Sequence, residues 1–387
     1  MKRFLFLTSA LASFAVAASA QEITIVSWGG AYGASQVEAY HKPYMELTGV
    51  KINSVDADNP ATPIKAQVEA GNVTIDIADV EPSDLVRLCD EGALEVLAIE
   101  DLPDGADGTP AAEDFIEGGL YDCGVGTIVY STLIAYRSDG GEAPTTTADF
   151  FDLEKFPGKR GLRKGAKYAL ELALMADGVP PAEVYDLLAT PEGVDRAFAK
   201  LDTIKDQVVW WEAGAQPPQL LADKEVVMTT AYNGRIFNAM ISENQPFELL
   251  WPNQILDFNL FVIPKGAPNK DAAWEFIKWS TSKQLINRMV KEKFLGSVTR
   301  RSIYETPDYR KLITVNGQDT GQIVLDTIKL GEQGHMKYRT VPVYPQVNVQ
   351  INQAISRIVS GQMSARESMN QAQTSIIADF RRAGVKI

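Results

Sequence analysis

The sequence has few of the residues that reaction centres and metal sites usually contain. Its 387 residues include only two histidines and two cysteines. It has no GxSxG nucleophile elbow and no spacing of His, Cys and Asp that suits a metal ion. His41 falls on a helical stripe with Tyr40 and Tyr44, where a buried imidazole is the simpler interpretation, and His335 is expected in a loop. We therefore expect no catalytic centre, no cofactor and no metal.

Long apolar runs are absent after the first twenty residues. Those twenty combine the basic start MKR, an apolar stretch and the small-residue sequence ASA before Gln21. This order is typical of a secretory signal peptide, here cut after Ala20. A buried helix or a membrane anchor is the alternative, but the stretch is short for a bilayer span. We therefore expect a signal peptide at 1–20 and a protein located in the periplasm.

Positive charge is scarce in the rest of the chain. Two of the 37 basic residues, Lys2 and Arg3, lie in the signal segment, which holds no acid. The mature chain thus carries 35 basic and 50 acidic residues, a formal charge of −15. Such a balance disfavours a nucleic-acid partner.

Cys89 and Cys123 are the only cysteines. An even number in an oxidising compartment favours one disulfide between them. Two unrelated buried thiols are the alternative, because sequence spacing does not show whether the two residues are close.

Strands and helices alternate from the mature N-terminus. Strand-like segments at 23–28, 50–55 and 75–80 are each followed by a helical pattern. This order predicts a parallel sheet with helices on both faces. Gly49 is expected to end the first helix, and Ser83 to cap the helix that follows the third strand.

The alternation restarts after a long strand-like run at 126–136, and a second extended run lies at 257–264. Two α/β units joined by such crossings suggest two lobes with a ligand cleft between them. We expect lobe 1 at 21–134 plus 260–310 and lobe 2 at 135–259 plus 311–387. A helix broken at Gly361 is expected over 348–382.

Aromatic residues gather where predicted strands end. Any one of them is more often core than site, but ligands of parallel sheets bind outside the carboxyl ends of the strands. Flat rings offer apolar faces to a methylene chain and π faces to a cation. The residues concerned are Trp28, Tyr32, Trp210, Trp211 and Tyr232.

Two charged residues could bind the charged ends of a small ligand. Arg235 follows a strand and a glycine, and a guanidinium can fork onto a carboxylate. Asp257 opens the second extended run and could take an ammonium group. The alternatives are a structural ion pair for Arg235 and a capping or hinge role for Asp257. The basic run KRGLRKGAK at 159–167 is most simply solvated surface, with a role near an anionic group as the alternative.

Four segments carry a resemblance to a known family: SWGGAYG (27–33), DIADVEPSDLVRL (76–88), VVMTTAYNGRIF (226–237) and LFVIPKGAPNKDAAWEFIKW (260–279). With them the chain resembles periplasmic solute-binding proteins of ABC importers, in the group that includes the polyamine binders. The resemblance implies a two-lobed α/β periplasmic-binding-protein fold of type II-like topology, with hinge closure on one solute. It also implies a monomer that serves an inner-membrane permease and its ATPase.

The same resemblance implies that Trp28 and Tyr232 stack on the ligand, and that Ser83 is a site serine. Asp257 falls where polyamine members have an aromatic ring. Positions where those members tend to carry carboxylates are held here by Gly165, Tyr168, Arg235 and Asn259.

These departures bear on the ligand. A guanidinium beside a diamine's ammonium in a closed cleft is repulsive, at a cost on the order of several kcal/mol. A solute with a carboxylate for Arg235 and an amine for Asp257 removes the conflict. We therefore expect an ω-amino acid such as GABA (γ-aminobutyric acid), or another amino acid, with rings around its stem and Gln216 and Gln219 adding hydrogen bonds. The predicted ligand-binding residues are Trp28, Tyr32, Ser83, Trp211, Gln216, Tyr232, Arg235, Asp257 and Asn259.

Two other functions remain open from the sequence. One is a polyamine binder of the same family. The other is a secreted hydrolase or transferase on the same fold, whose nucleophile would have to be Cys89 or Cys123 with His41 as its base. An iron binder ranks low because the sequence has no Tyr-Tyr pair.

Overall fold

The computed structural model describes residues 21–282 and 299–304, together with 314–315, 318–319 and positions 357, 368, 371 and 375. The predicted signal peptide, His335, most of 311–387 and nearly all of the predicted helix at 348–382 lie outside the described residues. In the part described, no helix is long and apolar enough to cross a membrane.

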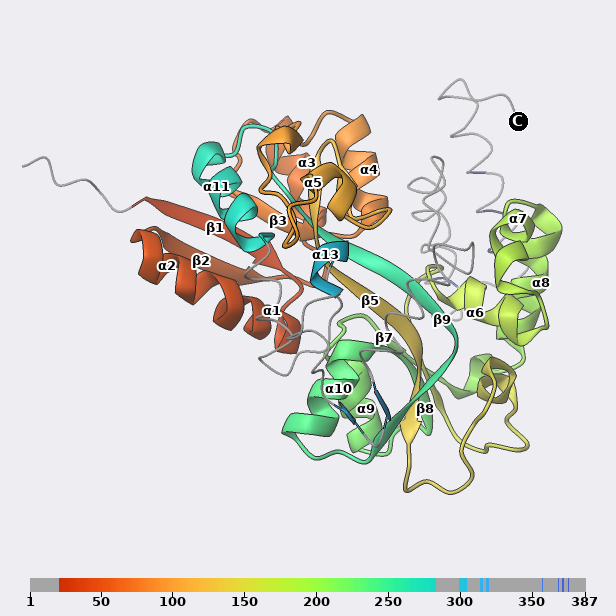
Figure 1. Ribbon diagram of the computed structural model, residues 1–387. Coiled ribbons are helices and arrows are strands. Elements are labelled where there is room, and N and C mark those ends of the chain that lie inside the picture. Colours follow the sequence, from red (N-terminus) through yellow and green to blue (C-terminus); the bar gives the residue numbers. More distant parts are fainter. Residues whose placement is uncertain are drawn as a thin grey trace, which may run out of the picture.

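One mixed sheet organises the described chain (Figure 1). Its strand order is β2-β1-β3-β9-β5-β8-β6-β7, with β4 paired to β5. Strands β2, β1 and β3 run parallel to one another at one end, and β8, β6 and β7 do so at the other. The strands are β1 Glu22–Ser27, β2 Lys51–Asp56, β3 Ile77–Val80, β4 Leu120–Tyr121, β5 Gly124–Arg137, β6 Arg160–Arg163, β7 Val208–Trp211, β8 Met228–Tyr232 and β9 Phe247–Val262, with a separate pair, β10 Thr314–Val315 and β11 Gln318–Asp319.

Helices cover both faces of this sheet, as the alternating pattern predicted. A π-helical turn, η1 Val37–His41, joins the first two of them, and Gly49 ends the second with a left-handed φ of 76°. The helices are α1 Gly30–Gln36, α2 Lys42–Thr48, α3 Thr62–Glu69, α4 Pro82–Asp90, α5 Ala111–Asp114, α6 Ala169–Ala176, α7 Val184–Leu188, α8 Pro191–Asp202, α9 Gln216–Ala222, α10 Asn233–Ser242, α11 Lys270–Ser280 and α13 Arg301–Tyr304.

Two long antiparallel strands, β5 and β9, run through the centre and join the two parallel units (Figure 1). They have 14 and 16 residues and pair from Val125 opposite Phe261 to Arg137 opposite Phe247. Both predicted extended crossings are therefore present. Strand β9 begins at Phe247, well before the predicted start at 257.

Each half of the sheet has its own hydrophobic cores, one on either face. Residues of β5 up to Val129 and of β9 from Leu256 onward pack in the first half, whereas Leu133 onward and the part of β9 up to Ile255 pack in the second. Ile128 and Val129 enter different cores because successive strand residues point to opposite faces. The exact limits of the lobes stay a prediction.

The N-terminus of α4 differs from the prediction. Glu81, in extended conformation, is the N-cap, and Pro82 is the first helical residue. The predicted capping role of Ser83 is therefore wrong. Proline is favoured at the first helical position because an N–H there would have no partner within the helix, and because its fixed φ suits the helix.

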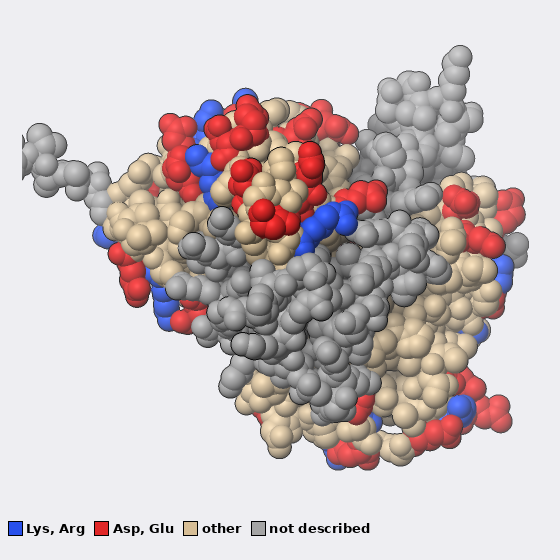
Figure 2. Space-filling model, viewed as in Figure 1, with Lys and Arg blue, Asp and Glu red and all other residues tan. Residues whose placement is uncertain are grey.

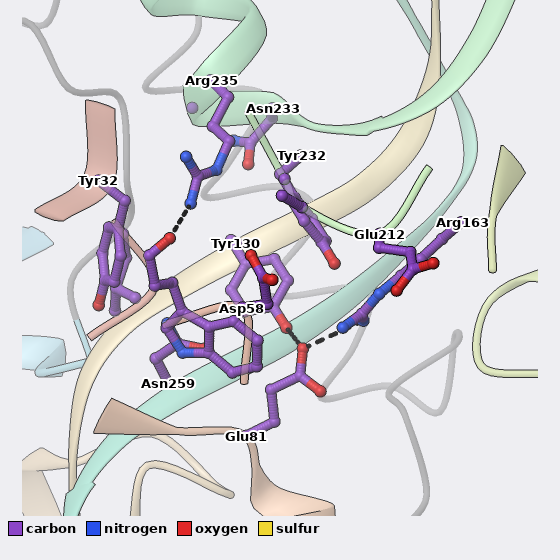
Figure 3. Close-up of a pocket in the computed structure, with 15 residues that line it drawn as sticks. Tyr32, Asp58, Glu81, Tyr130, Arg163, Glu212, Tyr232, Asn233, Arg235 and Asn259 are labelled. Atoms are coloured by element: carbon purple, nitrogen blue, oxygen red, sulfur yellow. Dashed lines mark hydrogen bonds and ion pairs between the residues drawn. The ribbon is translucent and has the colours of Figure 1, made fainter. Parts of the chain in front are cut away.

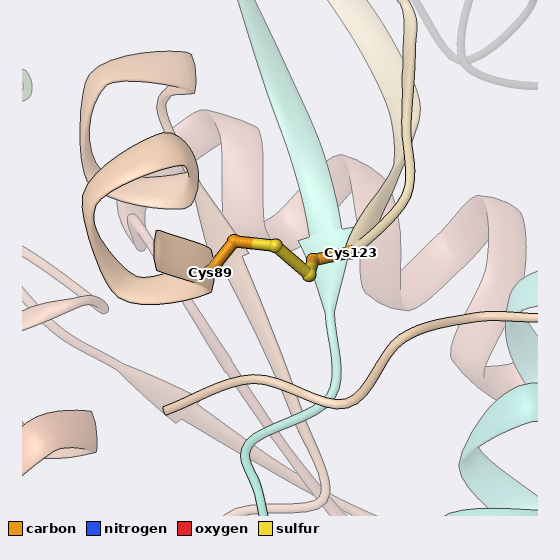
Figure 4. The surroundings of a disulfide bond; sticks show 2 residues. All are labelled: Cys89 and Cys123. Carbon is orange, nitrogen blue, oxygen red and sulfur yellow. A yellow bond between two sulfur atoms is a disulfide. The ribbon is translucent and has the colours of Figure 1, made fainter. Parts of the chain in front are cut away.

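The predicted disulfide is confirmed. Cys89 at the end of α4 bonds Cys123 just before β5, with the Cα atoms 6.0 Å apart (Figure 4). The bond ties a helix of the first half to the start of a central strand.

Acidic side chains prevail over basic ones on the described surface in Figure 2, most densely over the first half, in line with the negative net charge.

Candidate ligand-binding site

A half-enclosed cavity lies where both parallel units end against β5 and β9 (Figure 3). Its cavity volume is about 60 Å³. It is lined by Trp28, Tyr32, Asp58, Glu81, Ile128, Tyr130, Arg163, Glu212, Ala213, Gly214, Tyr232, Asn233, Gly234, Arg235 and Asn259.

Every strand of the two parallel units sends a residue to this cavity from its carboxyl end. In a parallel unit the carboxyl ends meet at one edge, so residues far apart in the sequence converge there. Those of the first half are Asp58, Trp28 and Glu81, after β2, β1 and β3; those of the second are Arg163, Glu212 and Tyr232, at or after the ends of β6, β7 and β8.

Aromatic rings form the apolar walls. Tyr130 of β5 meets Tyr232 edge to face, with ring centroids 5.4 Å apart. Trp211 packs against Tyr232 from behind, at 5.8 Å, and is itself fully buried. The indole Nε1 of Trp28 is buried without a hydrogen-bond partner among the described residues. The walls thus combine flat apolar faces with an unused donor.

Arg235 brings a positive charge from α10 to the opposite half of the molecule. Its Nη2 donates to the carbonyl oxygen of Trp28 at 3.1 Å, and the residue is 7% exposed. Its Nη1 has no partner in the described part of the chain. Burial lowers the pKa of the guanidinium. A Cβ on Gly30, whose φ is +58°, would lie 2.6 Å from Nη1, so this close approach requires glycine in SWGGAYG.

Four charged side chains form a buried network beside the cavity. Lys167 Nζ lies 2.7 Å from Glu81 and 2.6 Å from Asp257, and Arg163 lies 3.6 Å from Glu81. Tyr130 donates to Glu81 at 2.9 Å. Burial alone would raise the pKa of Glu81, but Lys167 and then Arg163 lower it to about 2. Glu81 is therefore an ionised carboxylate at the cavity wall, and Lys167 and Arg163 balance its charge.

A further carboxyl group, Asp79 at the end of β3, lies beneath Tyr32. It accepts hydrogen bonds from the Tyr32 hydroxyl and the Gln36 amide, both at 2.7 Å, and from the Ser27 hydroxyl at 3.3 Å. It is fully buried and no cation pairs with it among the described residues. Burial raises its pKa to about 7.

The rim of the cavity is acidic. Glu212 is paired with Lys164 at 2.9 Å, and both side chains are exposed. Gln216 accepts hydrogen bonds from the backbone N–H groups of Glu212 and Ala213, at 2.7 and 2.9 Å, and so fixes the loop that carries them. Asp58 enters the rim from the first half.

The structure brings five predicted ligand residues to the cavity: Trp28, Tyr32, Tyr232, Arg235 and Asn259. Trp211 and Gln216 lie one layer behind, supporting Tyr232 and the loop at 212–214. Ser83, inside α4, does not line the cavity. Asp257 does not line it either, because Lys167 and the Tyr168 hydroxyl, at 2.7 Å, cover its carboxylate.

Sequence reasoning missed several residues of the cavity. Four of them carry a charge and lie at the end of a strand or in the loop that follows it. The strand-end rule that selected Trp28 could therefore have found them. The missed residues with polar side chains are Asp58, Glu81, Tyr130, Arg163, Glu212 and Asn233.

The residues considered for catalysis are placed elsewhere. Cys89 and Cys123 are joined, so neither thiol is available as a nucleophile. His41 is 2% exposed and its Nδ1 hydrogen-bonds the Ser54 hydroxyl at 2.7 Å; burial lowers its pKa to about 4. Among the described residues, no group of three His, Cys, Asp or Glu side chains could hold a metal ion.

The cavity lies between two α/β units and is lined by buried rings and a buried guanidinium. These features define a protein that binds a small polar solute. Comparison with known proteins supports this class. A family model described as bacterial extracellular solute-binding protein matches residues 39–314. The chain therefore belongs to the bacterial extracellular solute-binding proteins, as the sequence segments predicted, and it is a binding protein and not an enzyme.

Individual relatives show which solute-binding proteins the chain is similar to. Over 275 residues the chain is 46% identical to a gamma-aminobutyric acid-binding protein of Pseudomonas aeruginosa, covering 70% of this chain and 76% of that protein. The structure of the periplasmic binding protein MotA of A. tumefaciens B6, in complex with glucopine, is 27% identical with a TM-score of 0.74, covering 88% of this chain and 100% of that one. The structure of a GABA receptor is 30% identical with a TM-score of 0.63, covering 81% and 96%. The predicted α/β periplasmic-binding-protein fold is confirmed.

Proposed function

We propose that this protein captures a small zwitterionic amino acid, GABA in the first instance, and delivers it to the permease of an ABC importer. In this proposal the chain is exported to the periplasm, residues 1–20 are removed after Ala20, and the two predicted lobes close on the solute. The observation that carries the choice of ligand class is the buried guanidinium of Arg235, whose Nη1 has no partner among the described residues.

The carboxylate of the solute binds Arg235. A buried guanidinium with a free N–H group gains most from an anionic acceptor, because a charge-assisted hydrogen bond is stronger than a neutral one. Nη1 has no acceptor among the described residues, and Nη2 has only a backbone carbonyl. The indole Nε1 of Trp28, also without a partner there, adds a second donor at the same wall.

The methylene stem lies between the rings of Trp28, Tyr130 and Tyr232. The ammonium end then points toward the acidic rim, where Asp58 and Glu212 carry carboxylates from opposite halves. This assignment moves the ammonium acceptor from Asp257 to the rim, since Lys167 already occupies Asp257. Asp58 and Glu212 would approach the solute together when the lobes close.

Two relatives support GABA over other zwitterions. The protein of Pseudomonas aeruginosa is named for binding gamma-aminobutyric acid, and a second relative is a GABA receptor. The polyamine alternative is weaker, because a diamine offers Arg235 only ammonium groups and leaves the guanidinium without a counter-charge.

Calorimetric titration of ligand-stripped protein tests the proposal. GABA is expected to bind, putrescine not, and Arg235→Met is expected to weaken GABA binding by about 3 kcal/mol, because a buried charge-assisted contact is lost. Arg196→Met, which removes an exposed arginine paired with Asp177, is the control of equal charge and should bind GABA like the original protein. Tight putrescine binding without any GABA response would overturn the proposal.

A further inference from the structure

The basic run at 159–167 is not simply a solvated surface. Arg160 is fully buried and donates to four backbone carbonyl groups, and Arg163 lines the cavity. Lys164 pairs with Glu212 on the rim, whereas Lys159 is exposed. Lys167, at the end of the run, has a side chain only 11% exposed, and its ammonium group bridges two carboxylates.

Those two carboxylates form a binding place for an ammonium group. Glu81 comes from the first half and Asp257 from the central strand β9, and their side chains are 8% and 1% exposed. Both hold Lys167 Nζ at hydrogen-bond distance, 2.7 and 2.6 Å. Hydroxyl groups complete the site, with Tyr130 donating to Glu81 and Tyr168 to Asp257.

This ammonium site is continuous with the cavity. Glu81 and Tyr130 line the cavity wall (Figure 3). Both also belong to the site around Lys167 Nζ, because Lys167 pairs with Glu81 and Tyr130 donates to Glu81. A lysine ends in a primary ammonium on an alkyl chain, which is the same chemical group as either end of a linear diamine. The protein thus supplies internally the group that a diamine would bring.

We propose that Lys167 is a specificity-determining residue that excludes diamines by occupying the carboxylates their second ammonium would need. The inference rests on the proposed function and adds the reason why solutes with one amine are selected. Glu81, Asp257, Lys167 and Arg163 sum to zero net charge. A second ammonium would therefore find Glu81 and Asp257 already paired with Lys167 and would lie near two cations.

Removing the Lys167 ammonium leaves the network one positive charge short. Glu81 then keeps only Arg163, at 3.6 Å, and Asp257 loses the cation that pairs with it. A desolvated carboxylate without a counter-charge strongly favours an incoming cation. Lys167→Ala also removes the alkyl chain, which opens a space of the shape of n-propylammonium.

Calorimetry on the full mature chain measures the gain. Lys167→Ala and Lys167→Met are expected to raise putrescine affinity by about tenfold or more over the original protein. Lys159→Met makes the same charge change on an exposed residue of the same run and should leave the putrescine affinity unchanged. If both Lys167 variants fold and their putrescine affinity stays that of the original protein, the proposal is overturned.

Thermal unfolding with added amine gives a second readout that is independent of GABA. We expect n-propylammonium to raise the melting temperature of Lys167→Ala, and n-propanol, its neutral counterpart, to leave it unchanged. If Lys167→Ala unfolds without amine, refolding with n-propylammonium alone supports the proposal, and failure to refold with it counts against it. GABA titration of the original protein tests the proposed function separately, so the two failures are distinguishable.

Discussion

Arg235 and Lys167 are two buried cations beside one cavity, and they are partnered in opposite ways. Lys167 bridges two carboxylates within 2.7 Å. Arg235 meets only the carbonyl oxygen of Trp28, at 3.1 Å, and its Nη1 has no partner among the described residues. Both side chains pay a desolvation cost; two ion pairs offset that of Lys167, whereas no described carboxylate lies within ion-pair distance of Arg235.

This contrast distinguishes a structural charge from a ligand-binding one. A buried charge whose partners come from the protein stabilises one arrangement of the chain. A buried charge with an unused donor that faces a cavity is stabilised when a solute supplies the counter-charge. Stability and binding measurements should therefore separate the two sites.

The largest effect is expected from Glu81→Gln. Glutamine removes the charge that Lys167 and Arg163 share while keeping the shape of the side chain. Breaking a buried ion pair from one side leaves uncompensated charge, so the unfolding free energy of the ligand-free protein should fall by about 3–5 kcal/mol. Urea denaturation measures this difference.

The exposed pair between Lys164 and Glu212 provides the control for Glu81→Gln. Lys164→Met should change the unfolding free energy by less than about 1 kcal/mol, because exposed pairs are screened by water. Equal losses in the two variants would mean that the buried network has no special role in stability.

Asp79 is an intermediate case, a buried carboxyl group held by neutral donors only. Its pKa is raised from 3.8 to about 7 in the folded protein. Between these values the unfolded chain ionises while the folded protein keeps the proton, so this group lowers stability as pH rises from 4 to 7. Three units of pKa correspond to about 4 kcal/mol, an upper value for the effect.

Comparison with Asp79→Asn isolates that contribution. The unfolding free energy of the original protein, minus that of the variant, should fall as pH rises from 4 to 7 and level off above 7. Other titrating groups, including His41, are present in both proteins and cancel in the difference. Parallel pH profiles would show that Asp79 has the same pKa folded and unfolded.

The sequence predicted the sheet and much of the cavity because one rule places both. Carboxyl ends of parallel strands meet at one edge, so Trp28, Tyr232 and Arg235 could be selected before the structure was known. The same rule applies to Glu81, which directly follows β3. Serine is a preferred cap, which favoured Ser83. Pro82, at the first helical position, was the signal that the cap is Glu81, two residues before Ser83.

Asp257 shows what the sequence could not supply. It is two residues from Asn259 in β9, so both side chains point to the same face of the sheet. Whether a carboxylate on that face reaches the cavity depends on the loop that packs over it. Tyr168 there has a φ of 70°, and that loop lays Lys167 across Asp257. No periodic pattern encodes such a loop path.

The smallest effect on stability is expected from Arg235→Met, although its effect on binding is the largest. Methionine has a similar length and no charge to desolvate, so the ligand-free unfolding free energy should stay within about 1 kcal/mol of the original value. A saturating solute at a hundred times its dissociation constant adds about 2.7 kcal/mol of stability to the original protein, and none should appear in the variant. A large loss of ligand-free stability in Arg235→Met would place Arg235 with Lys167, as a charge that holds the two halves together through the Trp28 carbonyl. Unchanged stability with lost binding would show that this guanidinium is kept buried for the solute.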